Sequence, residues 1–289
     1  MKRITCSSHC PVRVPSHFFT KSRLKQSGQY RNNEVSRLTI LFKRGDGQLK
    51  IYAHRGYSAK YPENTLAAFR ATAELPVHGV EFDVHLTADQ QVVVIHDEKI
   101  DRTSNGTGYV KDMTLEELRK FDYGAWFSDE FSGEVIPTLA EVLEVFKETH
   151  HHINIELKSD IFVYAGLEEA VLREVEAQGM SDRVVISSFD HEAVRRVAEL
   201  APNVENAALF VNMILDVAEY QEKLPANALH VFLPTAVRKT VLEAISKGSV
   251  VRVWTVNEVE YATQLLHIGV DAIFTDEPEK MLEFLSSVK

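Results

Sequence analysis

Residues 50–75, KIYAHRGYSAKYPENTLAAFRATAEL, decide the fold class of this chain. The stretch opens as a hydrophobic strand, breaks at the tripeptide HRG (residues 54–56) and resumes as a helix after the PENT segment at 62–65. A strand, a short connection and an amphipathic helix form a βα unit, the building block of parallel sheets. A histidine beside an arginine at the break also points to an anion that the pair would bind.

The same alternation of strand and helix patterns continues to the end of the chain. Helical patterns separate most of the strand candidates, and glycines that end helices follow at 179, 248 and 269. About 240 residues of such units is the usual size of a (β/α)₈ barrel, so the sequence predicts an α/β fold of the TIM barrel type. The strand candidates are KIYAH, GVEFDVH, QVVVIH, HINIELK, RVVISSF, NAALFV, LHVFL, VVRVWTV and DAIFTD.

One of these nine strands is surplus to an eight-stranded barrel. Residues 79–97, GVEFDVHLTADQQVVVIHD, leave no room for a crossover helix between their two hydrophobic runs. Parallel strands need such a crossover, so we expect these two to meet through a turn and to distort the barrel. The long, glycine-containing stretch at about 100–135 is then a small insertion after the third strand, or an active-site loop.

The charge is distributed unevenly along the 289 residues. Residues 1–50 contain eleven Lys or Arg but only two acidic residues, which leaves 21 basic and 40 acidic residues for positions 51–289. Nucleic-acid surfaces need clustered Lys and Arg to neutralise phosphates, so the acidic body argues against a nucleic-acid partner. A small anionic substrate would need a local basic site or a bound cation.

Residues 1–48 lack any sustained period and are rich in polar side chains, so we expect a disordered, basic N-terminal extension. Three interpretations stay open: a targeting or anchoring arm, a solvated tail, and sequence translated from upstream of a natural start at Leu49. The barrel domain would then comprise residues 49–289.

The cysteine pattern and the apolar runs bear on cellular location. Both cysteines, Cys6 and Cys10, fall in the extension, so no disulfide framework supports the body. The chain has no apolar run of about 18 residues, and its N-terminus lacks the apolar core of a signal peptide. We therefore expect a cytoplasmic protein without stable membrane insertion.

Polar side chains stand where the predicted strands end, which is where α/β barrels carry their chemistry. By contrast, the three consecutive histidines 150–152 precede a strand, at the end of the barrel that serves stability. The polar residues at or near strand ends are His54, Arg55, Glu81, Asp83, His96, Asp97, Glu156, Lys158, Ser187, Ser188, Trp254, Asn257, Thr275 and Asp276.

Three carboxylates within this set predict a metal site. Glu81 and Asp83 point the same way because side chains alternate along a strand, and Glu156 lies near the end of the strand candidate HINIELK. Converging buried carboxylates repel one another unless a cation neutralises them, and oxygen ligands without cysteine favour Mg²⁺, Ca²⁺ or Mn²⁺. The alternative is the ordinary alternation of a half-exposed strand.

The two histidines at strand ends predict acid and base catalysis. Imidazole in general titrates near neutral pH, which suits His54 and His96 to proton transfer, although a single histidine in such a place is often structural. Arg55 and Lys158 face the same carboxylates, and cations so placed fit a phosphate clamp better than solvated surface charges.

Seven motifs in order along residues 51–280 together resemble the glycerophosphodiester phosphodiesterase family, in particular its bacterial cytosolic type. Residues 272–274, AIF, depart from it, because a glycine after the preceding aspartate is frequent there, and residues 1–48 have no counterpart. The motifs are AHRGYSAKYPENTLAAF, GVEFDVHLTADQQVVVIHDEKIDRTSNGTG, IPTLAEVL, NIELK, VISSF, VWTVN and GVDAIFTDEP.

The resemblance assigns a role to each candidate residue. It implies that His54 and His96 are the catalytic histidines and that Glu81, Asp83 and Glu156 are the metal carboxylates. Arg55 and Lys158 would contact the phosphate. Glu63 would be a further acidic site residue, either a ligand or an orienting partner, and Trp254 would be the aromatic beside the glycerol.

The activity implied by the resemblance is metal-dependent hydrolysis of glycerophosphodiesters to sn-glycerol 3-phosphate and an alcohol, through a cyclic phosphate. Three rivals stay open. A lysophospholipase D-like phosphodiesterase would need an apolar entrance, and the sequence has no evident long hydrophobic loop. A non-catalytic barrel would bind the diester without needing the two histidines. A barrel enzyme of the enolase kind would use three carboxylates and Mg²⁺, but not paired histidines with Arg and Lys.

Overall fold

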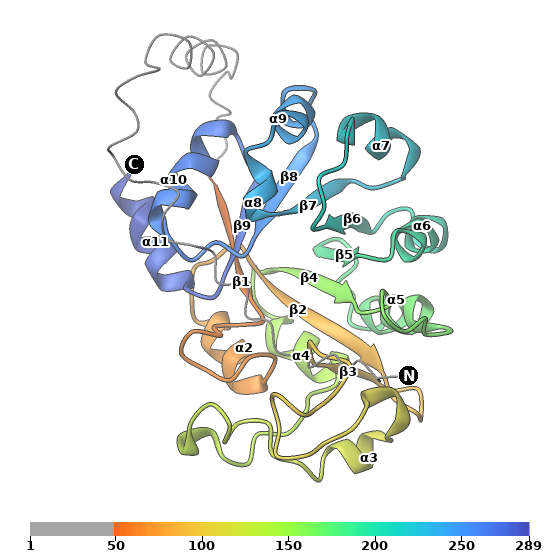
Figure 1. Cartoon of the computed structure of the whole chain (residues 1–289). Coiled ribbons are helices and arrows are strands. Elements are labelled where there is room, and N and C mark those ends of the chain that lie inside the picture. Colours follow the sequence, from red (N-terminus) through yellow and green to blue (C-terminus); the bar gives the residue numbers. More distant parts are fainter. Residues whose placement is uncertain (1–48, 289) are drawn as a thin grey trace, which may run out of the picture. The chain divides into compact units, whose positions relative to one another are not determined.

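A computed structural model of the chain describes residues 49–288, and the predicted N-terminal extension at 1–48 lies outside the described residues. Eight parallel strands form the barrel, and β1 pairs with both β9 and β2, which closes the sheet. The predicted TIM barrel is confirmed (Figure 1). The barrel strands are β1 (Lys50–His54), β2 (Gly79–Leu86), β4 (His152–Leu157), β5 (Val184–Ser188), β6 (Glu205–Phe210), β7 (Ala228–Phe232), β8 (Val250–Trp254) and β9 (Ala272–Thr275).

The ninth strand, β3 (Val92–Val94), is antiparallel to β2 and forms a hairpin with it, as the short spacing predicts. Because β3 runs back along the far half of β2, the backbone N–H of Ile95 donates to the carbonyl of Asp83 at 3.0 Å. This corrects one expectation. His96 does not end a barrel strand; the return of the hairpin brings it alongside the middle of β2, next to Asp83.

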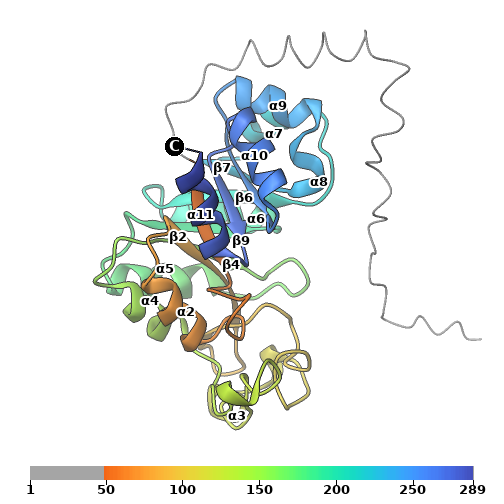
Figure 2. The ribbon, with the colours of Figure 1, turned by 90° about the vertical axis from the view of Figure 1, so that its left-hand side faces the viewer.

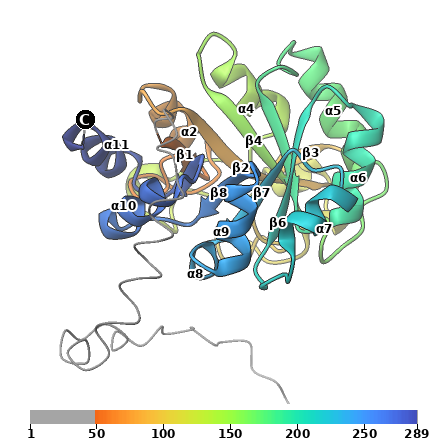
Figure 3. The same ribbon diagram turned by 90° about the horizontal axis from the view of Figure 1, so that it is seen from above.

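Helices surround the strands, and in Figure 1 they follow one another around the barrel in chain order. Seen from above in Figure 3, α5 and α6 lie on one side and α10 and α11 on the opposite side. The helices around the barrel are α2 (Leu66–Ala73), α4 (Leu139–Phe146), α5 (Leu167–Ala177), α6 (His191–Leu200), α7 (Val217–Lys223), α8 (Leu233–Ala236), α9 (Lys239–Ser246), α10 (Val259–Ile268) and α11 (Pro278–Ser287).

Local sequence explains where several helices begin. The side chain of Thr65 accepts from the backbone N–H of Ala68, which caps α2, and the PENT segment therefore ends at the helix start. Thr138 and Glu141 form a capping box at the start of α4. Within residues 49–288, no helix combines the length and the apolar character needed to cross a membrane.

The insertion after β3 packs around a hydrophobic cluster of its own. It contains the short helix α3 (Leu115–Leu118) and two 3₁₀ turns at Val110–Asp112 and Asp129–Phe131. Figure 2 shows α3 apart from the ring of helices. The buried members of the cluster come from β3, from the residue that follows it and from the insertion: Val93, Ile95, Ile100, Val110, Leu118, Tyr123 and Ile136.

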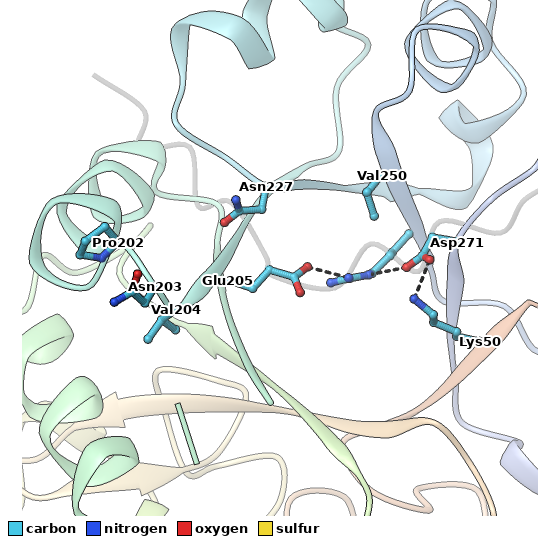
Figure 4. A pocket seen from close by; sticks show the side chains of 9 residues that line it. Lys50, Pro202, Asn203, Val204, Glu205, Asn227, Val250 and Asp271 are labelled. Atoms are coloured by element: carbon cyan, nitrogen blue, oxygen red, sulfur yellow. Dashed lines mark hydrogen bonds and ion pairs between the residues drawn. The ribbon is translucent and has the colours of Figure 1, made fainter. Parts of the chain in front are cut away.

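The amino-terminal end of the barrel holds a cavity of about 460 Å³. Among its charged lining residues, Lys50 and Glu205 begin strands, Asp271 directly precedes β9 and Arg252 is the third residue of β8; Figure 4 shows how they pair. Arg252 binds Glu205 at 2.6 Å and Asp271 at 3.0 Å, and Lys50 binds Asp271 at 2.8 Å. Every charge in this network has a partner of opposite sign.

Candidate active site

Strand register brings the predicted carboxylates together at the opposite, carboxyl-terminal end of the barrel. His54, the last residue of β1, lies opposite Glu81 of β2. Two residues further along β2, Asp83 lies opposite Glu156 of β4. Because side chains alternate along a strand, these neighbours present their side chains on one face of the sheet.

Glu81, Asp83 and Glu156 form one buried acidic cluster. An oxygen atom from each lies within 4.8 Å of the others, and all three residues are less than a tenth exposed. Burial, followed by repulsion from Asp83 and Glu156, raises the pKa of Glu81. Burial also raises the pKa of Glu156, more than Lys158 lowers it. A crowded set of carboxylates without thiolates is compatible with a hard divalent cation.

Asp83 differs from its two neighbours because cations surround it. Burial alone would raise its pKa, but the charges of His96, Arg55 and Lys158 lower it overall. The side-chain amide of Asn64 also donates to Asp83 at 3.0 Å. This carboxylate is therefore held ionised at the centre of the site.

Lys158 follows β4 and lies among the carboxylates. Its Nζ donates to Glu156 Oε1 at 2.8 Å and lies 3.9 Å from Asp83 Oδ1. The side chain is only 7% exposed, so both ion pairs are shielded from water. Burial would lower the pKa of Lys158, but Glu156 and Asp83 raise it above its usual range, which keeps the ammonium charged.

Arg55 sits in a turn that glycine makes possible. Its own φ is 57°, and Gly56 follows with φ 78°. A Cβ atom at Gly56 would lie 2.8 Å from the Cβ of Ala68, so α2 could not pack as closely against a larger residue. Left-handed backbone at a residue other than glycine is a strain that often accompanies functional sites.

This turn aims both the backbone and the side chain of Arg55 into the site. The backbone N–H donates to Glu81 Oε2 at 3.0 Å, and the guanidinium donates to Glu63 Oε1 at 2.9 Å. The buried Nε lies 3.5 Å from Asp83 Oδ2 and has no hydrogen-bond partner among the described residues. Buried N–H donors are rarely left without a partner, so this atom offers a contact to a bound anion.

Both predicted histidines are held through Nδ1 by an aspartate. His54 Nδ1 lies 2.7 Å from Asp276 Oδ1, and His96 Nδ1 lies 2.6 Å from Asp97 Oδ1. An ionised carboxylate only accepts, so Nδ1 carries the proton in the neutral imidazole and Nε2 offers a lone pair. His54 Nε2 lies 3.9 Å from Glu81 Oε2 and His96 Nε2 lies 3.5 Å from Lys158 Nζ, so both point toward the cluster.

Asp276 is itself fixed by neighbouring side chains. Asn257 donates to its Oδ2 at 2.7 Å and Ser58 donates to its Oδ1 at 3.1 Å. Burial would raise the pKa of Asp276, but the hydrogen bond and the charge of His54 lower it to about 2. The sequence marked Asp276, Asn257 and Asp97 as polar residues near strand ends, but it indicated neither their partners nor their roles.

A small cavity of about 50 Å³ lies over the cluster, and His54 and His96 are among the residues that line it. The apolar part of its lining includes Phe189, which follows β5, and Trp254 of β8, whose rings lie edge to face at 5.6 Å. A wider cavity of about 450 Å³ adjoins it, sharing His54 and Arg55 and reaching Glu63. All nine predicted site residues therefore line these two cavities or contact the residues that do.

The histidines at 150–152 lie at the other end of the barrel, as expected. His150 Nε2 lies 3.1 Å from the carbonyl of Val77, and His151 Nε2 lies 3.0 Å from the carbonyl of Leu75. These hydrogen bonds tie the start of β4 to the chain that precedes β2. They serve the fold and not the site.

Comparison with known sequences identifies relatives of this chain. The sequence profile of the glycerophosphoryl diester phosphodiesterase family matches residues 54–280. A glycerophosphodiester phosphodiesterase from Caldanaerobacter subterraneus subsp. tengcongensis is 40% identical over 235 residues, which cover 81% of this chain and 97% of the relative. One from Bacillus altitudinis is 40% identical over 243 residues, covering 83% of this chain and 99% of the relative.

Solved structures agree with the sequence comparison. A phosphodiesterase from Oleispira antarctica, in complex with the product sn-glycerol-3-phosphate, has a TM-score of 0.77 at 30% identity and covers 82% of this chain and 96% of its own. A glycerophosphodiester phosphodiesterase from Thermotoga maritima has a TM-score of 0.66 at 30% identity and covers 83% of this chain and 99% of its own. The chain therefore belongs to the glycerophosphoryl diester phosphodiesterase family of enzymes.

Proposed function

We propose that this protein hydrolyses glycerophosphodiesters to sn-glycerol 3-phosphate and an alcohol, with a divalent cation and two histidines. One observation carries the proposal: the buried cluster of three carboxylates lies beside two histidines, each held through Nδ1 by an aspartate. The bound product of the Oleispira antarctica relative supports a substrate of this class. The cytoplasm stays the predicted location.

Glu81, Asp83 and Glu156 would hold the cation, which we propose to be Mg²⁺, Ca²⁺ or Mn²⁺. When bound, it would neutralise the cluster, polarise a phosphate oxygen and lower the pKa of a nearby hydroxyl group. Carboxylate oxygens are the ligands that these ions prefer, and the set has no thiolate or imidazole that would select zinc.

The two histidines would move the protons. One histidine, neutral with a lone pair on Nε2, takes the proton of the glycerol 2-hydroxyl while that oxygen attacks phosphorus, and the other, protonated on both nitrogens, gives the proton of its Nε2 to the departing alcohol oxygen. A cyclic phosphate forms as the bond from phosphorus to the alcohol breaks. The roles then reverse, so that water opens the ring and the 2-oxygen regains its proton. The aspartate at each Nδ1 keeps the reactive Nε2 directed to the substrate.

The remaining predicted residues would bind the substrate. Arg55 and Lys158 would contact phosphate oxygens, and the free Nε of Arg55 supports this role. Trp254 would pack beside the glycerol, because it lies on the apolar wall of the cavity. For Glu63 we favour the orienting role, since its carboxylate already accepts from the guanidinium of Arg55.

The test is release of glycerol 3-phosphate from glycerophosphocholine, measured with divalent cation and with excess chelator. We expect release with the cation and none with the chelator, and activity should return when the cation is restored. Full turnover in chelator, with elemental analysis confirming absence of metal, would remove the metal from the mechanism. No release under any cation would overturn the proposed activity itself.

A second candidate substrate class is a glycerophosphodiester that carries one acyl chain. The sequence showed no apolar entrance, but the loops after β4 and β6, at the carboxyl-terminal end of the barrel, expose four aliphatic side chains. Their exposed fractions are 63% for Ile161, 82% for Val163, 60% for Met213 and 85% for Leu215. Apolar groups beside an active site favour an amphiphilic substrate.

The two classes are separated by comparing lysophosphatidylcholine, below its micelle concentration, with glycerophosphocholine. If the loops bind an acyl chain, Leu215→Ser should raise KM for the acylated substrate and leave glycerophosphocholine unaffected. Leu200→Ser is the matched control, because Leu200 is 49% exposed at the end of α6, away from these loops. Equal KM values for wild type and Leu215→Ser on both substrates would exclude the acyl-chain role.

A further inference from the structure

Arg102 is the residue through which the insertion contacts the candidate site. Its Nε and one terminal nitrogen donate to Asp97 at 2.8 and 3.1 Å. Its two terminal nitrogens donate to the two oxygens of Glu63, both at 2.8 Å. The guanidinium group of Arg102 therefore binds two carboxylates, each through two hydrogen bonds.

Each of these carboxylates in turn holds a group with a proposed role. Asp97 Oδ1 accepts from His96 Nδ1 at 2.6 Å, and Glu63 Oε1 accepts from Arg55 at 2.9 Å. Arg102 thus joins one acid/base histidine to the phosphate-binding arginine without contacting either of them. The sequence could not predict this, since Arg102 is 39 residues from Glu63.

His96 depends on such support more than His54 does. His54 is the last residue of a barrel strand, whereas His96 lies in the chain that follows the hairpin strand β3 and its side chain is 31% exposed. Arg102 follows it by six residues and stands on the insertion, whose own buried cluster gives a firm base. Held by a planar fork, Asp97 can fix the imidazole in one orientation.

Stability is a poor explanation for this network. The side chain of Arg102 is 44% exposed, and exposed ion pairs contribute little to the free energy of unfolding. Orientation is a better one, because catalysis is sensitive to small misplacements of a reacting group.

We propose that Arg102 is a positioning residue, which fixes the ring of His96 through Asp97 and the guanidinium of Arg55 through Glu63. The proposal rests on the proposed function, since it needs His96 to transfer protons and Arg55 to bind phosphate. It predicts a loss in kcat, because a mobile His96 spends less time in the reactive orientation.

The first experiment compares steady-state kinetics of wild type, Arg102→Met and Arg102→Lys on glycerophosphocholine at saturating divalent cation. We expect Arg102→Met to lower kcat about 10–100-fold, the usual cost of losing a partner that orients a site residue, with a smaller change in KM. Arg102→Lys should restore only part of the loss, because an ammonium group cannot hold both carboxylates bidentately.

The matched control is Arg119→Met. Arg119 caps the end of α3 in the same insertion. It pairs with Glu141 of α4, and not with Asp97 or Glu63. Its kcat should stay within about twofold of wild type, as surface substitutions usually do. The melting temperatures of Arg102→Met and Arg119→Met should match each other.

A double-mutant cycle tests the route of the effect. Because Arg102 acts partly through Asp97, the loss in Arg102→Met/Asp97→Asn should be smaller than the product of the two single losses. Independent, multiplicative losses would overturn the proposal. So would a raised KM at unchanged kcat, which marks a direct substrate contact, and so would equal losses in Arg102→Met and Arg119→Met with lowered melting temperatures, which mark a structural role.

Failure of this inference is distinguishable from failure of the proposed function. If wild type releases no glycerol 3-phosphate, the function is wrong. If wild type releases it and Arg102→Met does so with the same kcat, only the positioning role is wrong.

Discussion

The two ends of the barrel both carry buried charge, but only one end is balanced. At the amino-terminal end, two carboxylates meet two cations in the network of Lys50, Glu205, Arg252 and Asp271. At the carboxyl-terminal end, the three clustered carboxylates meet Arg55 and Lys158, and Glu63 adds a fourth negative charge that Arg102 offsets. An excess of buried negative charge remains at that end alone.

This difference teaches how to separate a structural charge network from a site. A paired network needs nothing from solution, because each desolvated charge has a partner. A cluster with surplus buried carboxylates is compatible with a divalent cation, and the raised pKa of Glu81 and of Glu156 reflects the cost of burying these charges close together.

The histidines repeat the contrast. At the carboxyl-terminal end, His54 and His96 bind aspartates through Nδ1 and direct Nε2 to the cluster. At the amino-terminal end, His150 and His151 use Nε2 to bind backbone carbonyls. In His150 and His151, Nε2 is therefore occupied by a hydrogen bond to the backbone and does not face a substrate.

The largest expected effect is on catalysis by the two histidines. His54→Ala and His96→Ala should each lower kcat by about 10²–10⁴-fold, the usual contribution of a positioned acid or base, while the melting temperature changes little. His151→Ala should leave kcat unchanged, because its ring contacts only structural groups. Small and equal effects from all three replacements would mean that His54 and His96 are structural too.

The second-largest effect is expected on stability, when the balanced ion-pair network at the amino-terminal end is broken. Arg252→Met should lower the free energy of unfolding by about 3 kcal/mol, because it removes the cation that pairs with Glu205 and leaves Asp271 paired with Lys50 alone. The value lies at the low end for a broken buried pair, since Glu205 and Asp271 are 35% and 25% exposed. Urea denaturation measures the loss, and kcat of the folded variant should equal that of wild type. A lowered kcat would show that the two ends are coupled.

Divalent cation should stabilise the protein through the unbalanced end. A ligand that binds only the folded state at 100 times its Kd adds about 2.7 kcal/mol, which raises the melting temperature. Asp83→Asn should lose this shift, and Glu205→Gln should keep it, because Glu205 lies in the balanced network. An equal shift in all three proteins would place the cation elsewhere.

Part of the site and of the strand pairing could be predicted from the sequence, and this success has a physical basis. Alternation along a strand is a local property, so the order of residues alone predicted that Glu81 shares a face with Asp83. The spacing of residues 79–97 likewise predicted the hairpin of β2 and β3, and the antiparallel pairing of these strands confirms it.

What the sequence could not give depends on contacts between distant segments. His54 reaches Asp276 only because β1 closes the barrel against β9, a separation of 222 residues. His96 reaches the site because the hairpin returns along β2. The exposed apolar residues in the loops after β4 and β6 cannot be told from ordinary loop residues in the sequence. No local period encodes these contacts, so tertiary structure alone reveals them.

A smaller effect concerns pH and the amino-terminal end. Burial, and then the neighbouring His152, lowers the pKa of His78 from 6.5 to about 4. A histidine with a depressed pKa in the folded state stabilises the fold above its unfolded pKa, and that contribution is lost as the pH falls from about 6.5 to about 4. His78→Phe should therefore flatten the decline of the urea midpoint over this range. An unchanged decline would mean that other groups cause it, such as His151 and His152, whose pKa is also lowered.

The smallest effect is expected from removing residues 1–48, which lie outside the described part of the chain. A chain that begins at Leu49 keeps β1 and all the proposed site residues, and Lys50 keeps its ion pair with Asp271. A polar segment without periodicity has little apolar surface to bury, so kcat and the melting temperature should both match the full chain. Limited proteolysis of the full chain should likewise cut among the Lys and Arg residues between 13 and 44 before it reaches the barrel. Loss of folding or of activity on truncation would instead mean that the segment packs on the barrel, and loss of membrane association alone would make the basic segment an anchor.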